Sequence, residues 1–373
     1  MTTVCHLLDR QGGWEQRLAA GQLVEHAGQR TWAARLASLG SAGARSPGLL
    51  PRLPVAIVSP SGLGLAAAPA VGRWLRDAAC EVVHTWGVQA ALAARCASAA
   101  PVVLELFDPA ISRRHATLIR VLSAQGPMAV CCSSQTVRRR LIEASVPPSS
   151  CVVIRPGVDF GLLNRCRSGP NRASLGLSQD DLVVLCPPAG TVGLDVVEAA
   201  WSVTLASHSR PRAKLVLAGE GPELHRVQRL LRATPRPNVL VRPPNNVPFE
   251  NLIAAADVLV VPARKDVSTT AVAWAMGAGA LVIGSATHSI AELIASRLNG
   301  LLFKPQFDES LAVPLARLLL EHHQHDKLRE VARGHAYEVF GVRRFVEQHR
   351  QLYSNLLGGA AAGEGIQDSA VVA

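Results

Sequence analysis

Short apolar runs alternate with helical patterns along this 373-residue chain, and the alternation limits the folds that it can adopt. The runs CVVI (151–154), LVVLC (182–186) and VLVV (258–261), for example, contain no charged or amide side chain. A strand of a parallel sheet is covered by helices on both faces and is apolar throughout, whereas a half-exposed strand alternates. The pattern therefore predicts an α/β protein built on parallel sheets.

The alternation stops at one polar segment, RSGPNR (167–172), and then begins again. The length of the chain also suggests two domains of ordinary size. We therefore predict two doubly wound domains, residues 1–168 and 169–339. Because open parallel sheets bind ligands at the carboxyl ends of their strands, we expect the domains to face each other across a cleft. We interpret 38–53 as a loop and 358–373 as a loose tail.

Composition excludes several classes of protein. Hydrophobic residues make up 49% of the chain and charged residues 18%, which is not the composition of a disordered protein. The apolar runs are too short to span a bilayer and no signal peptide begins the sequence, so we expect a soluble, cytoplasmic protein. The eight cysteines show no C-x-x-C spacing and no histidine at a metal-binding spacing. We therefore expect a reducing compartment, with neither a disulfide framework nor a zinc site.

The net charge of the chain is +10, with small clusters at Arg113-Arg114, Arg138–Arg140 and Arg343-Arg344. One interpretation is contact with phosphate-bearing partners or with the anionic inner face of a membrane. The other is an arginine-rich chain with solvated helix faces. The sequence has no basic tail and no zinc-finger or RNA-recognition signature, and aromatic residues are only 4% of it. A nucleic-acid partner is therefore not expected.

Paired glycines stand between the first predicted strand and the first predicted helix, in LLDRQGGWEQRL (7–18). Gly12 and Gly13 would let the backbone approach a ligand closely, and the N–H groups at the start of the helix would attract an anion. The alternative is that the two glycines only form a tight turn. The residues themselves leave both interpretations open.

Longer segments of the chain resemble one family. EVVHTWG (81–87) and the segment 129–160 resemble the acceptor domain of family 4 glycosyltransferases, which have the GT-B fold. FGVRRFVEQHRQLY (340–353) resembles the terminal helix of that family, so we expect 340–357 to return to the first domain. Five further segments follow the order and spacing of the family's donor domain: AKLVLAGEGPELHRV (213–227), AAADVLVVPAR (254–264), AWAMGAGALVIGS (273–285), IAELI (290–294) and NGLLFKP (299–305).

The resemblance, which covers about 4–357, implies a fold and an activity. The fold is GT-B, with two Rossmann-like doubly wound domains facing across a cleft. The activity is transfer of a sugar from a nucleotide-sugar donor to a glycan or lipid-linked acceptor. The family implies retention at the transferred carbon, no metal requirement, and no cofactor besides the nucleotide-sugar itself.

Candidate site residues come from the resemblance and from the predicted strand ends. Asp266 is the candidate catalytic carboxylate beside the donor sugar. His84 is a second candidate polar contact, although a lone histidine is more often structural. The base would lie near Arg242–Pro244 and the phosphates near Gly190, Thr191 and the helix start at 268–270. The full set of nucleotide-binding candidates is Gly12, Gly13, Gly190, Thr191, Gly219, Glu220, Arg242, Arg264, Ser268, Thr269 and Thr270.

Three positions depart from the family pattern. The family has a glutamate that binds the ribose hydroxyls, and Trp274 stands there, although tryptophan cannot accept a hydrogen bond. The segment LCPPAGTVGLD (185–195) lacks the arginine and lysine that neutralise the leaving diphosphate. Phe107 stands where the family often has a histidine. All three departures concern the chemistry of transfer.

Some of these losses have candidate replacements. Arg264 and Lys265, immediately before Asp266, are alternative cations for the phosphates. Ser268 is either a phosphate ligand at the start of a helix or the N-cap of that helix.

Two functions therefore remain open from the sequence. The first is an active glycosyltransferase. The second is a protein of the same fold without turnover, acting as a binding or partner protein in an envelope-polysaccharide pathway. A third class, a Rossmann-type dehydrogenase, is disfavoured because no G-x-G-x-x-G follows the first strand.

Overall fold

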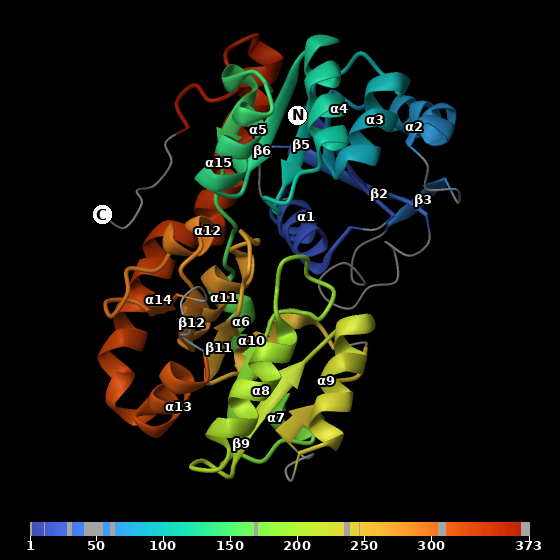
Figure 1. The fold of residues 1–373 in the computed structure, drawn as a ribbon. Helices are drawn as coiled ribbons and strands as arrows, with labels where there is room; N and C mark the ends of the chain where they lie inside the picture. Colours follow the sequence, from blue (N-terminus) through green and yellow to red (C-terminus); the bar gives the residue numbers. More distant parts are fainter. Residues whose placement is uncertain are drawn as a thin grey trace. The chain divides into compact units, whose positions relative to one another are not determined.

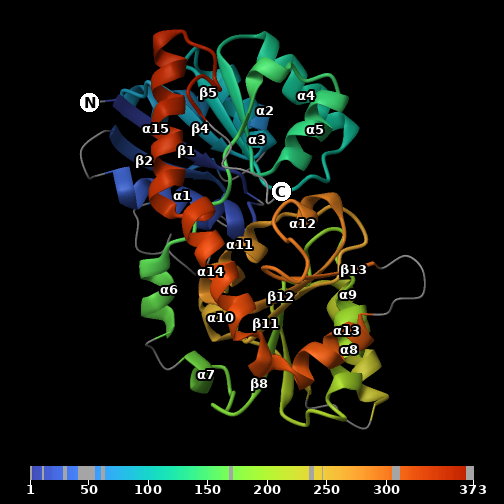
Figure 2. The ribbon, with the colours of Figure 1, turned by 90° about the vertical axis from the view of Figure 1, so that its left-hand side faces the viewer.

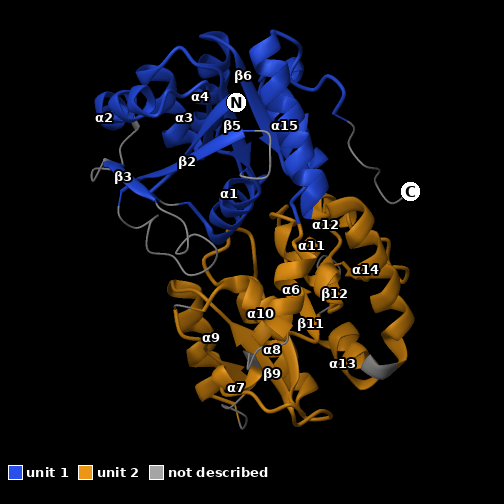
Figure 3. Cartoon of the chain, turned by 180° about the vertical axis from the view of Figure 1, so that it is seen from behind, with its two compact units in different colours: residues 1–157, 342–369 blue, residues 158–341, 370–373 orange. Residues whose placement is uncertain are grey.

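The structure, a computed structural model, describes residues 2–10, 12–27, 32–40, 55–59, 64–167, 171–234, 239–245, 247–304 and 311–366. The chain divides into two compact units, which are coloured separately in Figure 3. The first unit runs to Gly157 and includes the segment that begins at Val342, and the second runs from Val158 to Gly341. Each unit is a parallel sheet with helices on both faces (Figure 1), so the predicted α/β fold with two doubly wound domains is confirmed.

The sheet of the first unit has seven parallel strands in the order β3-β2-β1-β4-β5-β6-β7. The strand order reverses between β1 and β4, so the carboxyl ends of these two strands are the place where an open sheet binds ligands. The bounds of the strands are β1 Thr2–Leu8, β2 Trp32–Leu39, β3 Ala56–Ser59, β4 Val82–Trp86, β5 Val102–Leu106, β6 Met128–Cys132 and β7 Cys151–Val153.

Helices cover both faces of this sheet (Figure 2). On one face, Leu23 of α1 and Phe345 and Leu352 of α15 pack in the same core as strand residues. On the other face, Val71 of α2 and Ile119 of α4 belong to a second core. Because alternate strand residues enter two different cores, the strands are apolar throughout. The helices are α1 Trp14–Ala27, α2 Gly64–Asp77, α3 Val88–Ala97, α4 Arg113–Ala124, α5 Gln135–Glu143 and α15 Val342–Gly358, with the 3-10 turn η3 Pro148–Ser150.

The sheet of the second unit has six parallel strands in the order β10-β9-β8-β11-β12-β13. This is the same winding as in the first unit, and here the order reverses between β8 and β11. The strands are β8 Leu182–Cys186, β9 Ala213–Leu217, β10 Leu240–Val241, β11 Val258–Val261, β12 Leu281–Ser285 and β13 Leu301–Phe303.

One face of the second sheet packs against α8, α9 and α13, and Figure 2 shows α6, α10, α11 and α14 on the other. The helices are α6 Phe160–Arg167, α7 Asn171–Ser174, α8 Val196–Ala206, α9 Pro222–Arg232, α10 Phe249–Ala255, α11 Thr270–Ala278, α12 His288–Ala291, α13 Ala312–Leu320 and α14 Asp326–Phe340, with the 3-10 turn η5 His322–His325. Within the described residues, none of these helices or those of the first unit has the length and apolarity needed to cross a bilayer.

The composition of β2 does not predict a strand. Its residues, WAARLASL, are rich in alanine and contain Arg35, so they lack the β-branched composition typical of a strand. The segment becomes a strand because all seven of the β1 residues pair with it, from Thr2 opposite Trp32 to Leu8 opposite Ser38. The predicted loop at 38–53 overlaps the end of β2, and its part from 41 onward lies outside the described residues.

The units divide at Gly157, earlier than the polar segment 167–172 that the sequence suggests as a boundary. α6 lies before that segment, yet it packs in the second unit. The Sγ of Cys166 donates a hydrogen bond to Oδ1 of Asn251 in α10 at 3.0 Å, and Arg167 donates to the backbone oxygen of Ala278 in α11. The return of the terminal helix to the first unit, by contrast, agrees with the expectation for 340–357.

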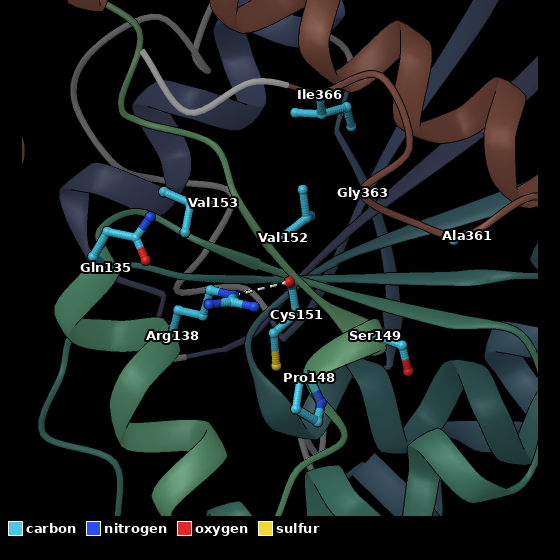
Figure 4. Close-up of a pocket in the computed structure, with 10 residues that line it drawn as sticks. All are labelled: Gln135, Arg138, Pro148, Ser149, Cys151, Val152, Val153, Ala361, Gly363 and Ile366. Carbon is cyan, nitrogen blue, oxygen red and sulfur yellow. Dashed lines mark hydrogen bonds between the residues drawn. The ribbon is translucent and has the colours of Figure 1, made fainter. Parts of the chain in front are cut away.

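The segment that follows α15 is docked as far as residue 366, which corrects the expectation of a loose tail over 358–373. Asn355 Nδ2 donates to the backbone oxygen of Glu364 at 2.8 Å, and Ala362 is buried in the core under α15. Ala361, Gly363 and Ile366 also form one wall of a cavity of about 320 Å³ beside β7, which Figure 4 shows. Residues 367–373 lie outside the described part of the chain.

The loops after β1 and β4 are joined by the half-buried carboxylate of Asp9. Asp9 Oδ1 accepts a hydrogen bond from Ala90 N at 2.6 Å, and Oδ2 accepts from Gln89 N at 3.3 Å, so Asp9 caps the first turn of α3. Gly87 precedes this helix with φ +124°, and a Cβ there would lie 2.0 Å from Asp9 Oδ2. Burial raises the pKa of Asp9 to about 6, although the two N–H groups oppose this shift.

Close packing of α11 in the second unit depends on a glycine. A Cβ on Gly277 would lie 2.7 Å from Cγ1 of Val158, and also near Leu163 and Phe160. Valine is stiff at χ1, so its methyl group cannot easily turn aside. Gly334, in the middle of α14, is a helical glycine with no atom within 4 Å of the position that its Cβ would take.

We predict that alanine has opposite effects at these two glycines. Gly277→Ala should lower the free energy of unfolding by about 1–3 kcal/mol, because the new methyl group overlaps Val158. Gly334→Ala should raise it by about 0.4–1 kcal/mol, because alanine restricts the unfolded chain and its methyl group meets no neighbouring atom at this exposed position. Denaturant unfolding of the two variants and the parent measures both effects, and a stabilising Gly277→Ala would contradict the packing described above.

We also predict a pH dependence of stability that is specific to Asp9. Its folded-state pKa lies above the unfolded value, so its contribution to stability is present at about pH 4 and below and is lost as the pH rises through about 6. Asn cannot titrate. The stability of the parent relative to Asp9→Asn should therefore fall between about pH 4 and pH 6.5, measured by urea unfolding across that range. A difference that does not change with pH would show that Asp9 titrates normally.

Candidate functional site

The carboxyl ends of β8 and β11 form the centre of the candidate site in the second unit. The two loops that follow these strands are paired by their backbones: Asp195 N donates to Pro262 O at 2.7 Å, and Arg264 N donates to Gly193 O at 2.8 Å. A β-bridge joins Leu194 and Ala263 between these two bonds. The chain thus fixes two strand ends against each other at the point where the strand order reverses.

An ion pair reinforces this pairing. Arg264 donates through Nε to Asp195 Oδ2 at 2.7 Å, and a second bond runs from Nη2 to the same oxygen. The other oxygen of Asp195 accepts from Glu198 N at 3.1 Å and caps α8. Arg264, one of the two cations expected for the phosphates, therefore lies near the loop 187–195, which contains no cation. The charge of Arg264 is balanced by Asp195. The neighbouring Lys265 is exposed, and it makes no ion pair with any residue that the structure describes.

Asp266 is largely buried between the loops that follow β11 and β12. Only 9% of its side chain is exposed. Oδ1 accepts a hydrogen bond from Ser289 N at 3.0 Å, and Oδ2 lies 3.9 Å from Nδ1 of His288. The carboxylate therefore holds the start of α12 in place, a structural role in addition to any role toward a sugar.

The start of α11 offers backbone N–H groups at the same edge of the sheet. Ser268 Oγ accepts from Thr270 N at 3.3 Å and lies 3.1 Å from Thr270 Oγ1. The N-cap of α11 is Thr269, one residue after the Ser268 that the sequence suggests for this position. The hydroxyl of Thr269 is buried and makes no hydrogen bond to any described residue. Ser268 Oγ accepts from the N–H group of Thr270. Other N–H groups in the first turn of a helix can donate to a phosphate oxygen.

Trp274 is fully buried in α11, where every residue of the helix is buried. The position of the family's ribose-binding glutamate therefore belongs to the core of this unit. Its indole can donate a hydrogen bond but cannot accept one, so it cannot replace the glutamate toward hydroxyl donors.

The loops after β8 and β9 also lie against each other. Ala189 N donates to Ala218 O at 2.9 Å, and a Cβ on Gly190 would lie 3.8 Å from the backbone oxygen of Glu220. Gly219 has φ +90°, and a Cβ there would lie 3.2 Å from Ala189 N, so only glycine fits this approach comfortably.

The other nucleotide-binding candidates lie at the same edge. Thr191 N donates to Pro188 O at 2.9 Å within the loop after β8. Glu220 accepts from Asn245 Nδ2 at 2.8 Å, which joins the loops after β9 and β10, and Arg242 is exposed immediately after β10. All the candidates of the second domain thus follow the carboxyl ends of strands of one sheet.

In the first unit, Gly12 and Gly13 lie after the carboxyl end of β1, at its switch point. Gly12 N donates to Asp9 O at 3.1 Å, and Gly13 N donates to Oε1 of Gln16 at 3.1 Å. Gly13 is exposed, and nothing lies within 4 Å of the position that its Cβ would take. The open space at Gly13 suits a close ligand, and the internal hydrogen bonds of Gly12 suit a tight turn.

The structure corrects the expectation for His84. It is the middle residue of β4, fully buried, and its Nδ1 lies 2.7 Å from the hydroxyl of Tyr353 in α15. Burial lowers its pKa to about 4. A side chain enclosed by the sheet and α15 cannot contact a substrate, so the alternative of a structural histidine is correct. Phe107, 4% exposed, likewise belongs to the core of this unit.

Two site residues were missed in the sequence. Asp195 is the N-cap of α8. Its sequence signal is an aspartate immediately before an apolar helical pattern. Ser289 binds both Asp266 and Val267, whose N donates to Ser289 Oγ at 3.1 Å. No local pattern identifies Ser289, because its partners lie more than twenty residues away in the chain.

Comparisons with known proteins agree with this geometry. The family model for group 1 glycosyl transferases matches residues 179–335, and the model for glycosyltransferase family 4 matches residues 20–161. No curated protein matches the chain.

Solved structures match the whole fold at low sequence identity. HepE of Anabaena in complex with UDP and glucose is 18% identical, with a TM-score of 0.74 over 94% of this chain and 99% of that chain. A glycosyltransferase of Rickettsia africae is 16% identical, with a TM-score of 0.73 over 96% and 99%. WaaG, a glycosyltransferase involved in lipopolysaccharide biosynthesis, is 16% identical, with a TM-score of 0.66 over 95% and 100%.

Each family model matches one of the two units, and the two matches occur in the order in which the units follow each other in the chain. The chain therefore consists of a family 4 glycosyltransferase domain followed by a group 1 glycosyl transferase domain, and it has the GT-B fold.

Proposed function

We propose that this protein transfers a sugar from a nucleoside-diphosphate sugar to a glycan or lipid-linked acceptor. The donor binds at the carboxyl edge of the second sheet, with its phosphates between the start of α11 and the loop after β8. The observation that carries this proposal is the fixed pairing of the loops after β8 and β11, through Asp195 and Arg264. This pairing fixes the two loops at the switch point of an open sheet, where an anion would bind.

The charge of the leaving group is balanced in three ways in this proposal. The helix start at Ser268–Thr270 supplies backbone N–H groups and the positive end of the helix dipole. Lys265 supplies an exposed ammonium group. Its Cβ lies close to Gly193 in the facing loop, so the side chain begins beside the loop after β8. Arg264 contributes more weakly, because Asp195 already neutralises it. Cations and N–H groups aimed at a developing diphosphate are the main source of rate in such a transfer.

Asp266 lies beside the donor sugar in this proposal and accepts hydrogen bonds from its hydroxyls. Transfer proceeds with retention and without a metal ion at the reacting centre, as the family resemblance implies. HepE, one of the similar structures, has been crystallised with UDP and with UDP-glucose, so uridine diphosphate sugars are the first donors to test.

The lipid-linked class of acceptor suggests peripheral contact with the anionic inner face of a membrane. Arg113 and Arg114 of α4 and Arg139 and Arg140 of α5 are exposed on the first unit. Clustered basic residues of this kind are attracted to anionic lipids. Salt-sensitive co-sedimentation with vesicles that contain anionic lipid tests this part of the proposal.

A specific observation favours a second candidate function. Trp274 occupies the ribose-binding position as a core residue, and the carboxylate of Asp266 is engaged with Ser289. A protein with these features could bind a nucleotide-sugar weakly and act as a partner in an envelope-polysaccharide pathway without turnover. Binding of a nucleotide-sugar with neither transfer nor donor hydrolysis would favour this second function.

We predict that UDP raises the melting temperature of the protein and that Lys265→Gln weakens this binding. Losing one exposed cation near a diphosphate should raise the Kd about tenfold, which corresponds to about 1.4 kcal/mol. Isothermal titration with UDP, GDP and ADP, followed by the corresponding sugars, measures the effect.

The matched control for this prediction is Lys327→Gln, which removes an equally exposed lysine from α14. Its affinity should equal that of the parent. If all three nucleotides fail to bind the parent, the donor site proposed above is wrong. Equal affinities in Lys265→Gln and the parent would place the phosphates elsewhere.

We further predict that two substitutions separate the chemical and structural roles of Asp266. The carbonyl oxygen of an asparagine can still accept from Ser289 N, so Asp266→Asn should keep the melting temperature while lowering the transfer rate about a hundredfold or more. Asp266→Ala should lose both the rate and part of the stability, because Ser289 N loses its partner.

Rates of transfer and of donor hydrolysis, measured with the donor that binds best, decide between the roles. A rate in Asp266→Asn equal to that of the parent, together with a loss in Asp266→Ala, would show that Asp266 only positions the loops.

A further inference from the structure

A row of potential metal ligands crosses the middle of the first sheet, outside the donor site. His6 of β1 pairs in register with His84 of β4, and Glu105 of β5 pairs with Cys131 of β6. All four side chains are fully buried. Alternation along the strands puts them on the face covered by α1 and α15, since Val4, Trp86, Val103 and Cys131 share a core with residues of α15. A polar row at this place needs an explanation, because an apolar residue would cost less to bury.

α15 adds a third ligand to His84 and Glu105. Nε2 of His349 lies 3.2 Å from Oε2 of Glu105, and Nε2 of His84 lies 3.4 Å from the same oxygen. One ligand atom from each of the three residues lies within 4.8 Å of the other two. His349 is also fully buried. Three elements that are far apart in the sequence therefore bring two imidazoles and one carboxylate to a single point.

The hydrogen bonds of this group are incomplete. Nδ1 of His349 faces the backbone oxygen of Phe345 at 2.8 Å, so Nδ1 carries the proton there. A neutral His349 would then present the lone pair of Nε2 to the carboxylate, which is repulsive. His84 Nε2 and Glu105 Oε1 make no hydrogen bond to any described residue. A cation between these groups, either a proton on an imidazole or a metal ion, would supply partners that they lack.

A proton on His349 would balance Glu105 but would leave His84 Nε2 and Glu105 Oε1 without partners. A metal ion would bind both imidazoles and the carboxylate at once. Ligands about 2.0–2.1 Å from a tetrahedral zinc ion lie about 3.4 Å apart, close to the two distances found here. The outer nitrogens also follow the usual pattern of metal-bound histidines, since one faces a backbone oxygen and the other the hydroxyl of Tyr353.

We propose that His84, Glu105 and His349 bind a zinc ion that fastens α15 to the sheet of the first unit. Two imidazoles and a carboxylate are ligands that zinc prefers, and one ligand atom of each of these three residues lies within 4.8 Å of the others. The site is closed to solvent, so the ion is structural and enters before α15 docks. The spacing of cysteines and histidines in the sequence gives no sign of this site, because its ligands come from three separate elements.

The experiment uses the full-length protein, stripped with EDTA under mild denaturation and refolded with ZnCl₂, with CoCl₂, or without metal. We expect about one equivalent of zinc per chain by elemental analysis, and a melting temperature several degrees above that of the metal-free protein. Cobalt should give the visible absorption bands of a tetrahedral site.

Variants distinguish this site from adventitious binding. Glu105→Gln and His349→Gln should lose the tetrahedral cobalt bands and the stabilisation by zinc. Tyr353→Phe keeps all three ligands and removes only the hydroxyl next to His84, so it should keep the bands with an affinity about 10–100-fold weaker. His225→Gln, on the exposed surface of α9, should behave like the parent.

The parent protein alone can overturn the proposal, even if a variant does not fold. Refolding that takes up no zinc, together with a ¹⁵N spectrum that shows a doubly protonated His349, would mean that a proton balances Glu105. Uptake of zinc that survives unchanged in Glu105→Gln would place the metal elsewhere in the chain and would also overturn it.

Discussion

Each unit of this protein depends on a parallel sheet that must be covered on both of its faces. Every strand needs a crossover helix to return the chain to the same end of the sheet, so all loops that leave the carboxyl ends of the strands meet at one edge. The winding reverses once in each sheet, between β1 and β4 and between β8 and β11. The reversal separates the helices that follow the two central strands and leaves room for a ligand.

In the second unit, the acidic side chains at this edge hold loops in place and are not left free for a ligand. Asp195 binds Arg264 and caps α8, and Asp266 binds Ser289 N. A carboxylate held by backbone donors is well positioned, which favours catalysis, but it is also partly occupied. The loops at this edge are therefore held together by their own side chains, and few charged groups are left for a sugar. The two candidate functions differ in whether such a site turns over a donor.

In the first unit, the polar row beneath α15 has the opposite character. Its groups are enclosed, and they join distant parts of the chain instead of meeting solvent. Burial alone would raise the pKa of Glu105, yet its contacts with His349 and His84 lower it, so the carboxylate is charged inside the core. A buried charge requires compensation within its own contacts. The terminal helix is thus fixed to the sheet by a specific interaction as well as by apolar packing.

The class of the fold follows from the sequence alone, because continuous apolar strands such as VLVV can be stable only in a sheet covered on both faces. The sequence also shows that Gly190, Gly219 and the segment 264–270 follow strand ends, since each comes directly after an apolar run. Tertiary structure alone decided the rest. β2 is a strand because β1 pairs with it, α6 belongs to the second unit because α10 and α11 receive it, and His84 is enclosed because α15 returns across the sheet. Local patterns carry no information about such partners, because the contacts join residues tens to hundreds of positions apart and their free energy exceeds local preference.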